Sequence, residues 1–247
     1  MRNIILLILL TVVASVQASE SHTVLVYNVG TKETVLSENA DVIRPMASIT
    51  KLMTAMIALD RYELSDKLPT GKKSRATVEQ LLIKLLVRSD NGAAEVLARN
   101  YPQGRTAFIR AMNDRSTQLG LIDTKFNDPS GLMPNTSTAK ELVKLVAAAG
   151  NYNFIRRISS QPAIYQTSQV KKKTKTVTLA NTNSNILFEF NNILVSKTGF
   201  TYKAGRCLAM LVDKNGQEHV IIILGERTKQ SRDQLARNLM LASSANY

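Results

Sequence analysis

Strand-like runs lie near both ends of this 247-residue chain, and helical patterns fill most of the sequence between them. The runs are rich in β-branched and aliphatic residues and cover residues 23–28, 34–36, 192–196, 206–213 and 218–225. A hairpin of two strands is only marginally stable in water, so neither group is expected to stand alone. We therefore predict one antiparallel sheet built from both ends of the chain, with a helical segment inserted between its strands.

Turn and cap residues divide the rest of the sequence. Asn215-Gly216 is a strong hairpin signal between the last two strands. Thr77 followed by Gln80, and Thr138 followed by Glu141, match the capping box that opens a helix. Helices are predicted at residues 48–62, 78–88, 93–100, 108–119, 139–150 and 232–242.

The N-terminus has the pattern of a secretory signal peptide. Arg2 precedes an apolar run at residues 4–14, and Val16-Gln17-Ala18 places small residues where a signal peptidase cuts. The apolar run is shorter than the ~20 residues that span a hydrocarbon core. We expect residues 1–18 to be removed after Ala18, leaving a periplasmic protein without a transmembrane segment.

The balance of charge is strongly basic. Lys and Arg number 32 against 19 Asp and Glu, which gives a formal charge of +13. Such a charge can indicate nucleic-acid binding. An exported protein is separated from the nucleic acids of the cell, so we expect no nucleic-acid partner. Cell-wall polymers and lipid head groups are the expected anionic counterparts. The lysine-rich run at residues 171–175 is interpreted as a solvated loop or guarded sheet edge rather than as a polymer contact.

Three short motifs follow one another along the chain. They are Ser48-Ile49-Thr50-Lys51, Ser89-Asp90-Asn91 and Lys197-Thr198-Gly199. The first pattern alone is weak, because residues 137–140 and 168–171 match it too. Ser48 differs because its copy precedes both other motifs and lies where an apolar helix is predicted to begin. The ordered set predicts a catalytic site, although each motif alone could be a turn or a strand end.

The first motif suits nucleophilic catalysis. Side chains at i and i+3 share a helix face, so the Lys51 amine and the Ser48 hydroxyl can meet. A serine hydroxyl needs a neighbouring base, and Lys51 can serve only when neutral. Its pKa must therefore fall through burial and through nearby cations, and Lys197 is the expected second cation.

The other two motifs suit proton relay and substrate binding. Ser89 can pass a proton towards a leaving group, and the Asn91 amide can orient the substrate backbone. Lys197 and Thr198 can hold a carboxylate, and Gly199 leaves the strand edge open for a substrate backbone. The single Cys207 lies in an apolar run and is expected to be a buried small hydrophobe without a disulfide partner in the chain.

The ordered set resembles that of low-molecular-mass penicillin-binding proteins, the serine D-Ala-D-Ala peptidases. The resemblance extends to residues 44–55, to Asp128-Pro129-Ser130-Gly131-Leu132, and to residues 197–201 and 204–208. It implies an α/β, β-lactamase/DD-peptidase-like fold, in which a central antiparallel sheet flanked by helices carries an inserted all-helical lobe. A single catalytic domain is expected at 19–247, with a sheet lobe at about 19–70 and 160–247 and a helical lobe at about 71–159.

The resemblance also implies roles for the site residues. Ser48 resembles the acylated nucleophile and Lys51 its general base, while Ser89 and Asn91 resemble the functional pair of the second motif. Lys197 and Thr198 resemble the carboxylate-binding pair, and the backbone N–H groups of Ser48 and Phe200 would form the oxyanion hole. The implied partners are peptidoglycan peptide stems and β-lactam antibiotics as covalent inhibitors, without a cofactor or a metal.

Two departures narrow the resemblance. The loop at residues 127–135 contains no glutamate to activate a deacylating water, so a penicillinase is disfavoured and slow release of a penicilloyl enzyme is expected. Residues 200–247 are taken up by two strands and one helix, which leaves no room for the added β domain and anchor of the common D,D-carboxypeptidases. The chain thus resembles the short murein DD-endopeptidases, the penicillin-binding protein 7 group.

The favoured function is therefore periplasmic hydrolysis of D-Ala cross-links in peptidoglycan. The first alternative is D-alanyl-D-alanine carboxypeptidase activity on uncross-linked pentapeptide, because the motifs do not distinguish the two leaving groups. A remote alternative is a non-catalytic wall-binding protein. A zinc peptidase or a Ser-His-Asp triad is poorly supported, since His22 and His219 are the two histidines and neither lies in a suitable motif.

Overall fold

The computed structural model describes residues 22–170 and 173–242. The predicted signal peptide at 1–18, and Lys171 and Lys172 of the basic run, lie outside the described residues. Of the helices that are described, none is long and apolar enough to cross a membrane.

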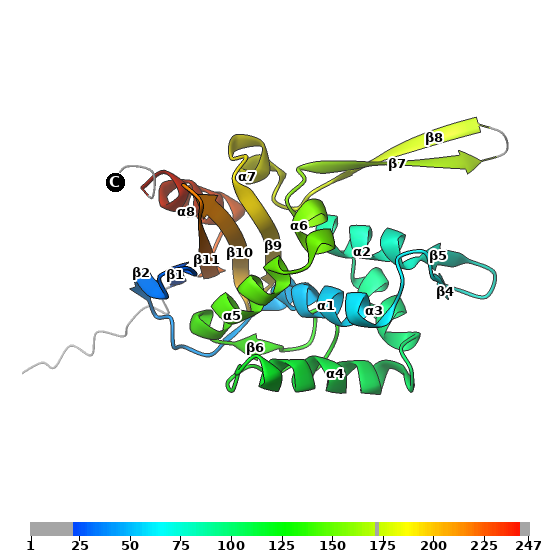
Figure 1. Ribbon diagram of the computed structural model, residues 1–247, viewed down its shortest axis with the longest axis horizontal. Helices are drawn as coiled ribbons and strands as arrows, with labels where there is room; N and C mark the ends of the chain where they lie inside the picture. Colours follow the sequence, from blue (N-terminus) through cyan, green and yellow to red (C-terminus); the bar gives the residue numbers. More distant parts are fainter. Residues whose placement is uncertain (1–21, 171–172, 243–247) are drawn as a thin grey trace, which may run out of the picture.

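A five-stranded antiparallel sheet joins the two ends of the chain, as predicted (Figure 1). Its order is β2-β1-β11-β10-β9, and Thr23 of β1 lies opposite Leu224 of β11. Asn215 and Gly216 turn between β10 and β11 with φ values of 54° and 79°, the left-handed conformation that a tight hairpin requires. The five strands are β1 (Thr23–Asn28), β2 (Glu33–Glu38), β9 (Ile193–Thr201), β10 (Gly205–Lys214) and β11 (Gln217–Glu226).

Both faces of this sheet are covered. In β11, Val220, Ile222 and Leu224 point into the larger apolar core, whereas Ile221 and Ile223 point into a smaller one. The alternation follows from the two-residue period of a strand. The one-turn helix at residues 47–50 and two longer helices cover the first face, and two helices near the C-terminus cover the second. The helical elements are η1 (Ala47–Thr50), α1 (Lys51–Arg61), α2 (Val78–Val87), α3 (Asn91–Arg99), α4 (Gly104–Gln118), α5 (Ala139–Gly150), α6 (Asn153–Ser159), α7 (Ser184–Glu189) and α8 (Lys229–Ala242).

The larger core is continuous between the sheet and the inserted helices. It includes Leu25 of β1 and Ile222 of β11 together with Leu82 of α2 and Phe108 of α4. Helix α5 packs on β9, β10 and β11 and also contacts α1. The division into a sheet lobe and a helical lobe stays a prediction.

The helix starts follow local capping. The box at Thr77 and Gln80 is complete, with Gln80 N donating to Thr77 Oγ1 at 3.1 Å and Thr77 N donating to Gln80 Oε1 at 3.0 Å. Helix α4 begins at Gly104, earlier than the predicted 108, because Gln103 and Gly104 both have positive φ and turn the chain into the helix.

The predicted role of Glu141 as a capping-box acid is wrong. Thr138 Oγ1 does accept the Glu141 N–H at 3.2 Å. The Glu141 carboxylate instead accepts from Asp123 N at 2.9 Å and from Thr124 Oγ1 at 2.6 Å. This buried carboxylate therefore ties the loop after α4 to α5, a long-range contact that outweighs the local one.

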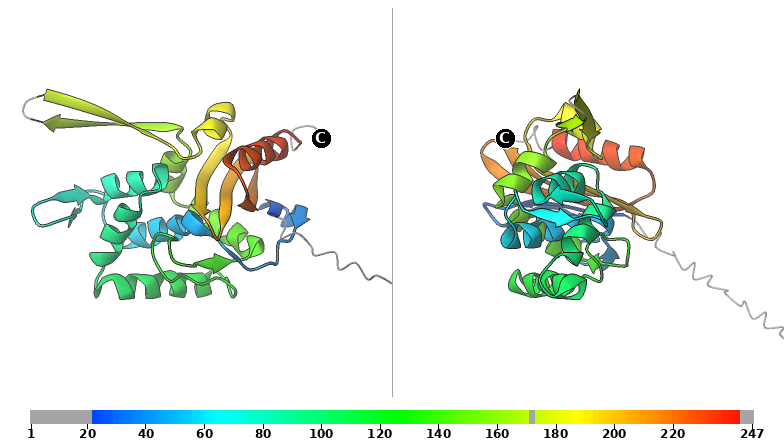
Figure 2. Two further views of the ribbon diagram at one scale, coloured as in Figure 1. Left: turned by 180° about the vertical axis from the view of Figure 1, so that it is seen from behind. Right: turned by 90° about the vertical axis from the view of Figure 1, so that its right-hand side faces the viewer.

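Short two-stranded pieces complete the fold. They are β3 (Arg44–Pro45) with β6 (Thr136–Ser137), β4 (Lys67–Pro69) with β5 (Arg75–Thr77), and β7 (Ala163–Val170) with β8 (Lys173–Ala180). The β7–β8 ribbon projects away from the body of the molecule (Figure 2). Part of the basic run, Lys173 to Lys175, lies in β8 at the far end of this ribbon.

Candidate active site

The first motif forms one turn of 3₁₀ helix that leads into α1. A 3₁₀ helix has three residues per turn, so the side chains at i and i+3 eclipse. Ser48 in η1 and Lys51 at the start of α1 are therefore aligned, and Lys51 Nζ lies 2.7 Å from Ser48 Oγ. The predicted meeting of amine and hydroxyl is present in the structure.

Lys51 has three hydrogen-bond partners and is fully buried. Besides Ser48 Oγ, its amine donates to Asn91 Oδ1 at 2.8 Å and to the Ser130 carbonyl at 2.5 Å. A protonated amine fills all three contacts with its three hydrogens. A neutral amine keeps the bonds to Asn91 and Ser130 and turns its lone pair to the Ser48 hydroxyl. The site thus accommodates both protonation states without rearrangement.

Burial is the largest influence on the Lys51 amine. Loss of water lowers the pKa of Lys51 from 10.5 to about 8, while the negative charges of Asp128 and Asp90 act in the opposite direction. The named charges that act on Lys51 are these two carboxylates. The Lys51 and Lys197 amines also repel one another, and this repulsion lowers the pKa of Lys197.

Lys197 reaches the site from the opposite side, on β9. Its amine donates to Ser89 Oγ at 3.0 Å and to the Thr198 carbonyl at 2.9 Å, and it is buried. Burial, followed by the positive charges of Lys51 and Arg232, holds the pKa of Lys197 well below its usual range. An incoming anion would relieve this repulsion and favour the charged amine.

The second motif is both a turn and a bridge between the lysines. Ser89 lies between α2 and α3 with φ of 57°, and Asp90 caps α3 by accepting the Ala93 N–H at 2.8 Å. The two flanking side chains point to different amines, Ser89 to Lys197 and Asn91 to Lys51. The turn interpretation and the functional one therefore hold together: Asp90 builds the turn that positions its neighbours.

Gly199 brings β9 against the η1 turn that carries Ser48. A Cβ at this position would lie 3.0 Å from Met46 O, Ala47 Cβ and Ser48 N. The missing side chain permits this close approach, a need that the strand-edge argument did not foresee. Strand β9 is also the last strand of the sheet, so its outer edge has no strand partner within the described residues. The next residue, Phe200, is 41% exposed, with the Arg206 guanidinium 3.6 Å from its ring centre.

A buried loop completes the surroundings of Lys51. The Asp128 carboxylate accepts hydrogen bonds from Gly131 N at 2.9 Å and from Asn135 Nδ2 at 3.0 Å, and it also contacts Ser130 Oγ. Thr54 Oγ1 of α1 donates to the Pro129 carbonyl at 2.6 Å. These bonds hold the Ser130 carbonyl against the Lys51 amine. Sequence reasoning quoted this loop only as a family resemblance and assigned it no role.

The chain is similar in sequence to known peptidases. A profile of the D-alanyl-D-alanine carboxypeptidase family, peptidase S11, matches residues 62–228. The D-alanyl-D-alanine endopeptidase of Escherichia coli strain K12 is 35% identical over 221 residues, which is 83% of this chain and 71% of that relative. The chain belongs to this family of serine-type D-Ala-D-Ala peptidases.

Two further relatives of this D-Ala-D-Ala peptidase agree. The D-alanyl-D-alanine endopeptidase of Pseudomonas aeruginosa is 36% identical over 225 residues, covering 84% of this chain and 72% of the relative. The cefotaxime-bound structure of penicillin-binding protein D2 from Listeria monocytogenes has a TM-score of 0.78 at 26% identity, covering 90% of this chain and 96% of that one. The predicted family and fold class are confirmed.

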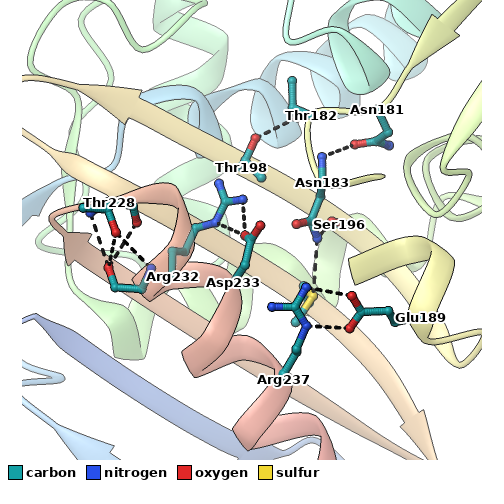
Figure 3. Close-up of polar contacts among 12 residues, drawn as sticks. Asn181, Thr182, Asn183, Glu189, Ser196, Thr198, Thr228, Arg232, Asp233 and Arg237 are labelled. Atoms are coloured by element: carbon teal, nitrogen blue, oxygen red, sulfur yellow. Dashed lines mark hydrogen bonds and ion pairs between the residues drawn. The ribbon is translucent and has the colours of Figure 1, made fainter. Parts of the chain in front are cut away.

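Two site neighbours of this peptidase were missed by sequence reasoning (Figure 3). Arg232 of α8 is buried beside Asp233, with Nε donating to Asp233 Oδ1 at 2.9 Å, and its charge acts on Lys197. Thr182 accepts a hydrogen bond from the Thr198 hydroxyl at 2.7 Å. Neither residue belongs to a motif, and only the folded chain brings them to β9. Among the described residues, no group of three or more His, Cys, Asp or Glu could hold a metal ion.

Proposed function

We propose that this chain is a serine DD-endopeptidase that hydrolyses D-Ala cross-links of peptidoglycan through an acyl-enzyme on Ser48. The observation that carries the proposal is the 2.7 Å contact between the buried Lys51 amine and the Ser48 hydroxyl. The two curated relatives described above, named D-alanyl-D-alanine endopeptidases, support this substrate choice.

Acylation uses Lys51 in its neutral form. The amine takes the proton of Ser48 as Oγ attacks the carbonyl carbon of the D-Ala residue. The backbone N–H groups of Ser48 and Phe200 would stabilise the resulting oxyanion, and one such donor is typically worth ~10²–10³ in rate. Collapse of the tetrahedral intermediate breaks the peptide bond, and Ser89 delivers its proton to the leaving amine. The proton that Lys51 took from Ser48 then passes to Ser89, which leaves Lys51 neutral again.

Deacylation returns the enzyme to its starting state. Water attacks the acyl carbonyl and gives a proton to neutral Lys51. Lys51 returns that proton to Ser48 Oγ as the acyl–oxygen bond breaks, so Ser48 leaves as a hydroxyl. The loop at 127–135 offers no glutamate for this step, so a penicilloyl enzyme is expected to persist. β-Lactams should therefore act as covalent inhibitors, and bound cefotaxime in the Listeria relative supports this expectation.

An endopeptidase and a carboxypeptidase of this family differ in the leaving group that they release. A D-alanyl-D-alanine carboxypeptidase, the activity that the family description prints, would release D-Ala from uncross-linked pentapeptide instead. The two reactions are compared by digesting purified cross-linked muropeptide dimers beside pentapeptide monomers at equal concentration. Faster loss of the dimer supports the proposal, and exclusive loss of the monomer's terminal D-Ala favours the carboxypeptidase.

Covalent labelling tests the nucleophile itself. Wild type should bind fluorescent penicillin irreversibly, and Ser48→Ala should not. Labelled Ser48→Ala protein would overturn the assignment. Unlabelled wild type that binds cell walls without cleavage would instead revive the non-catalytic alternative.

We also propose a periplasmic location, which rests on residues 1–18 alone. The protein should be recovered from the periplasmic fraction, lacking those residues, when its gene is expressed with its own leader. Mass spectrometry of the mature N-terminus tests the expected cut after Ala18.

A further inference from the structure

Thr182 lies between two of the three motifs. It follows β8 and precedes α7, and it accepts a hydrogen bond from Thr198 Oγ1 at 2.7 Å (Figure 3). Its own N–H donates to the Val87 carbonyl at 3.1 Å, at the end of α2 and two residues before Ser89. Thr182 therefore connects the strand that carries Thr198 to the turn that carries Ser89.

Two asparagines fix this position from both sides. Asn181 Nδ2 donates to the Ser159 carbonyl at 3.1 Å and to the Gln161 carbonyl at 2.9 Å. Asn183 Nδ2 donates to Ser196 Oγ on β9 at 2.9 Å. Both asparagines are buried, whereas Thr182 between them is half-buried. The loop thus holds a hydroxyl at the edge of β9 without burying it.

The Thr182 and Thr198 hydroxyls have only one hydrogen each to donate. A hydroxyl has one hydrogen and two lone pairs. The geometry of the two side chains places Thr198 Oγ1 as the donor to Thr182 Oγ1 when no anion is bound. To bind a carboxylate, Thr198 must turn that hydrogen to the anion, because a carboxylate only accepts. Thr182 still carries a hydrogen of its own, which can then be donated to Thr198 Oγ1.

We propose that Thr182 is a positioning residue for substrate-carboxylate recognition: it accepts from Thr198 in the empty site and donates to Thr198 once a carboxylate is bound. No proton leaves either oxygen, and only the direction of the hydrogen bond reverses. The bond keeps the Thr198 hydroxyl oriented in both states, so little reorganisation accompanies binding. This inference rests on the proposed function, in which Lys197 and Thr198 bind the carboxylate.

The test compares an acid with its neutral ester. The second-order rate constant of acylation is measured for benzylpenicillin and for its methyl ester, with wild type, Thr182→Val and Thr182→Ser. Valine matches threonine in shape but lacks the hydroxyl. Thr182→Val removes the partner that orients the Thr198 hydroxyl, so it should acylate about tenfold more slowly with the acid, which corresponds to about 1.4 kcal/mol. The rate with the ester should change little, and Thr182→Ser should restore the rate with the acid.

Two controls make the result specific. Thr178→Val changes an exposed threonine of β8 and should leave both rates at wild-type values. In a Thr198→Val background, Thr182→Val should have no further effect on the acid. Independent, additive losses in the double variant would overturn the inference, since they would show that the two hydroxyls do not act as a pair.

The remaining outcomes separate the inference from the proposed function. Equal losses with acid and ester would show a purely structural role for Thr182, and no loss with either would show no role. Both results overturn the inference alone. A wild type that acylates with acid and ester at the same rate would overturn the carboxylate role of Lys197 and Thr198, and the inference with it.

Discussion

The Lys51 amine is surrounded by acceptors but deprived of water, and this combination sets its chemistry. Ser48, Asn91 and Ser130 satisfy it in either protonation state, so its charge is decided by burial and by nearby carboxylates. A lysine in water is almost wholly protonated at neutral pH. Here a substantial fraction of the base is available just above neutrality.

This balance predicts how acylation depends on pH. Only neutral Lys51 can accept the Ser48 proton, and its pKa is about 8. The rate constant of acylation by benzylpenicillin should therefore rise about tenfold per pH unit well below 8 and level off above it. A rate that stays constant between pH 6 and 9 would show that Lys51 is not the base.

Asp128 should shift this profile. Its negative charge raises the pKa of Lys51, opposing burial. In Asp128→Asn that charge is gone, so the midpoint of the acylation profile should move to lower pH. The variant also loses acceptors for buried N–H groups, which typically costs ~1–3 kcal/mol and should lower the melting temperature.

The two effects are read separately. The pH midpoint is measured on folded protein, below the melting temperature of the variant, and compared with wild type. A midpoint that stays in place while the melting temperature falls would restrict Asp128 to holding the loop.

At the scale of elements, the η1 turn that carries Ser48 is held between two backbone segments. Strand β9 approaches it at Gly199, and the loop after α4 approaches it at Gly131. A Cβ on Gly131 would lie 2.0 Å from the Ala47 carbonyl oxygen, and Gly131 has φ of +83°. The turn that carries Ser48 therefore keeps its place through two contacts that only glycine permits.

Gly131→Ala should consequently lose most of its acylation activity, because the loop or the turn must move. Gly216→Ala is the matched control: φ there is +79°, but nothing lies within 4 Å of the new Cβ. Both variants should lose roughly 1 kcal/mol through backbone strain, and Gly131→Ala should lose more because of the close contact with Ala47; urea unfolding measures both losses. Only Gly131→Ala should lose penicillin labelling, and equal labelling of the two would contradict the contact argument.

Elements marked by a long apolar run or by turn and cap residues were predictable from the sequence, and the short or solvent-exposed elements before β9 were not. The β-branched and aliphatic run at residues 218–225 and the Asn215-Gly216 turn predicted the C-terminal hairpin, because burial and left-handed φ leave local marks. No element was predicted for residues 151–191, where the structure has α6, β7, β8 and α7. The β7–β8 ribbon carries Tyr165 and Val177 exposed to solvent, so its sequence shows no face turned to a core.

The site residues that were predicted lie in local motifs, whereas those that were missed reach the site from distant segments. Ser48, Lys51, Ser89, Asn91 and Lys197 belong to motifs whose internal spacing is visible in the sequence, and the structure brings them together. The Ser130 carbonyl, Thr182 and Arg232 act through contacts between distant segments. Lys51 and Ser130 are separated by 79 residues, and no local pattern predicts such a contact.

For the whole molecule, the formal charge of +13 predicts how it meets the cell wall. Attraction of a basic protein to an anionic polymer weakens as salt screens it. Ser48→Ala, which should not cleave, should sediment with purified sacculi at low ionic strength and be released at ~0.5 M salt. Retention unaffected by salt would contradict an electrostatic attraction.

Because β1 pairs with β11, the site can be completed only late in the synthesis of the chain. Thr23 lies opposite Leu224, and Ser48 is completed by Gly199 and Lys197. A ribosome makes Ser48 and Lys51 early and supplies the strand beside them more than a hundred residues later. Until that strand has emerged the sheet cannot close, because contacts between distant segments form only when both are present. The order of translation thus keeps a growing chain from hydrolysing anything before it is finished.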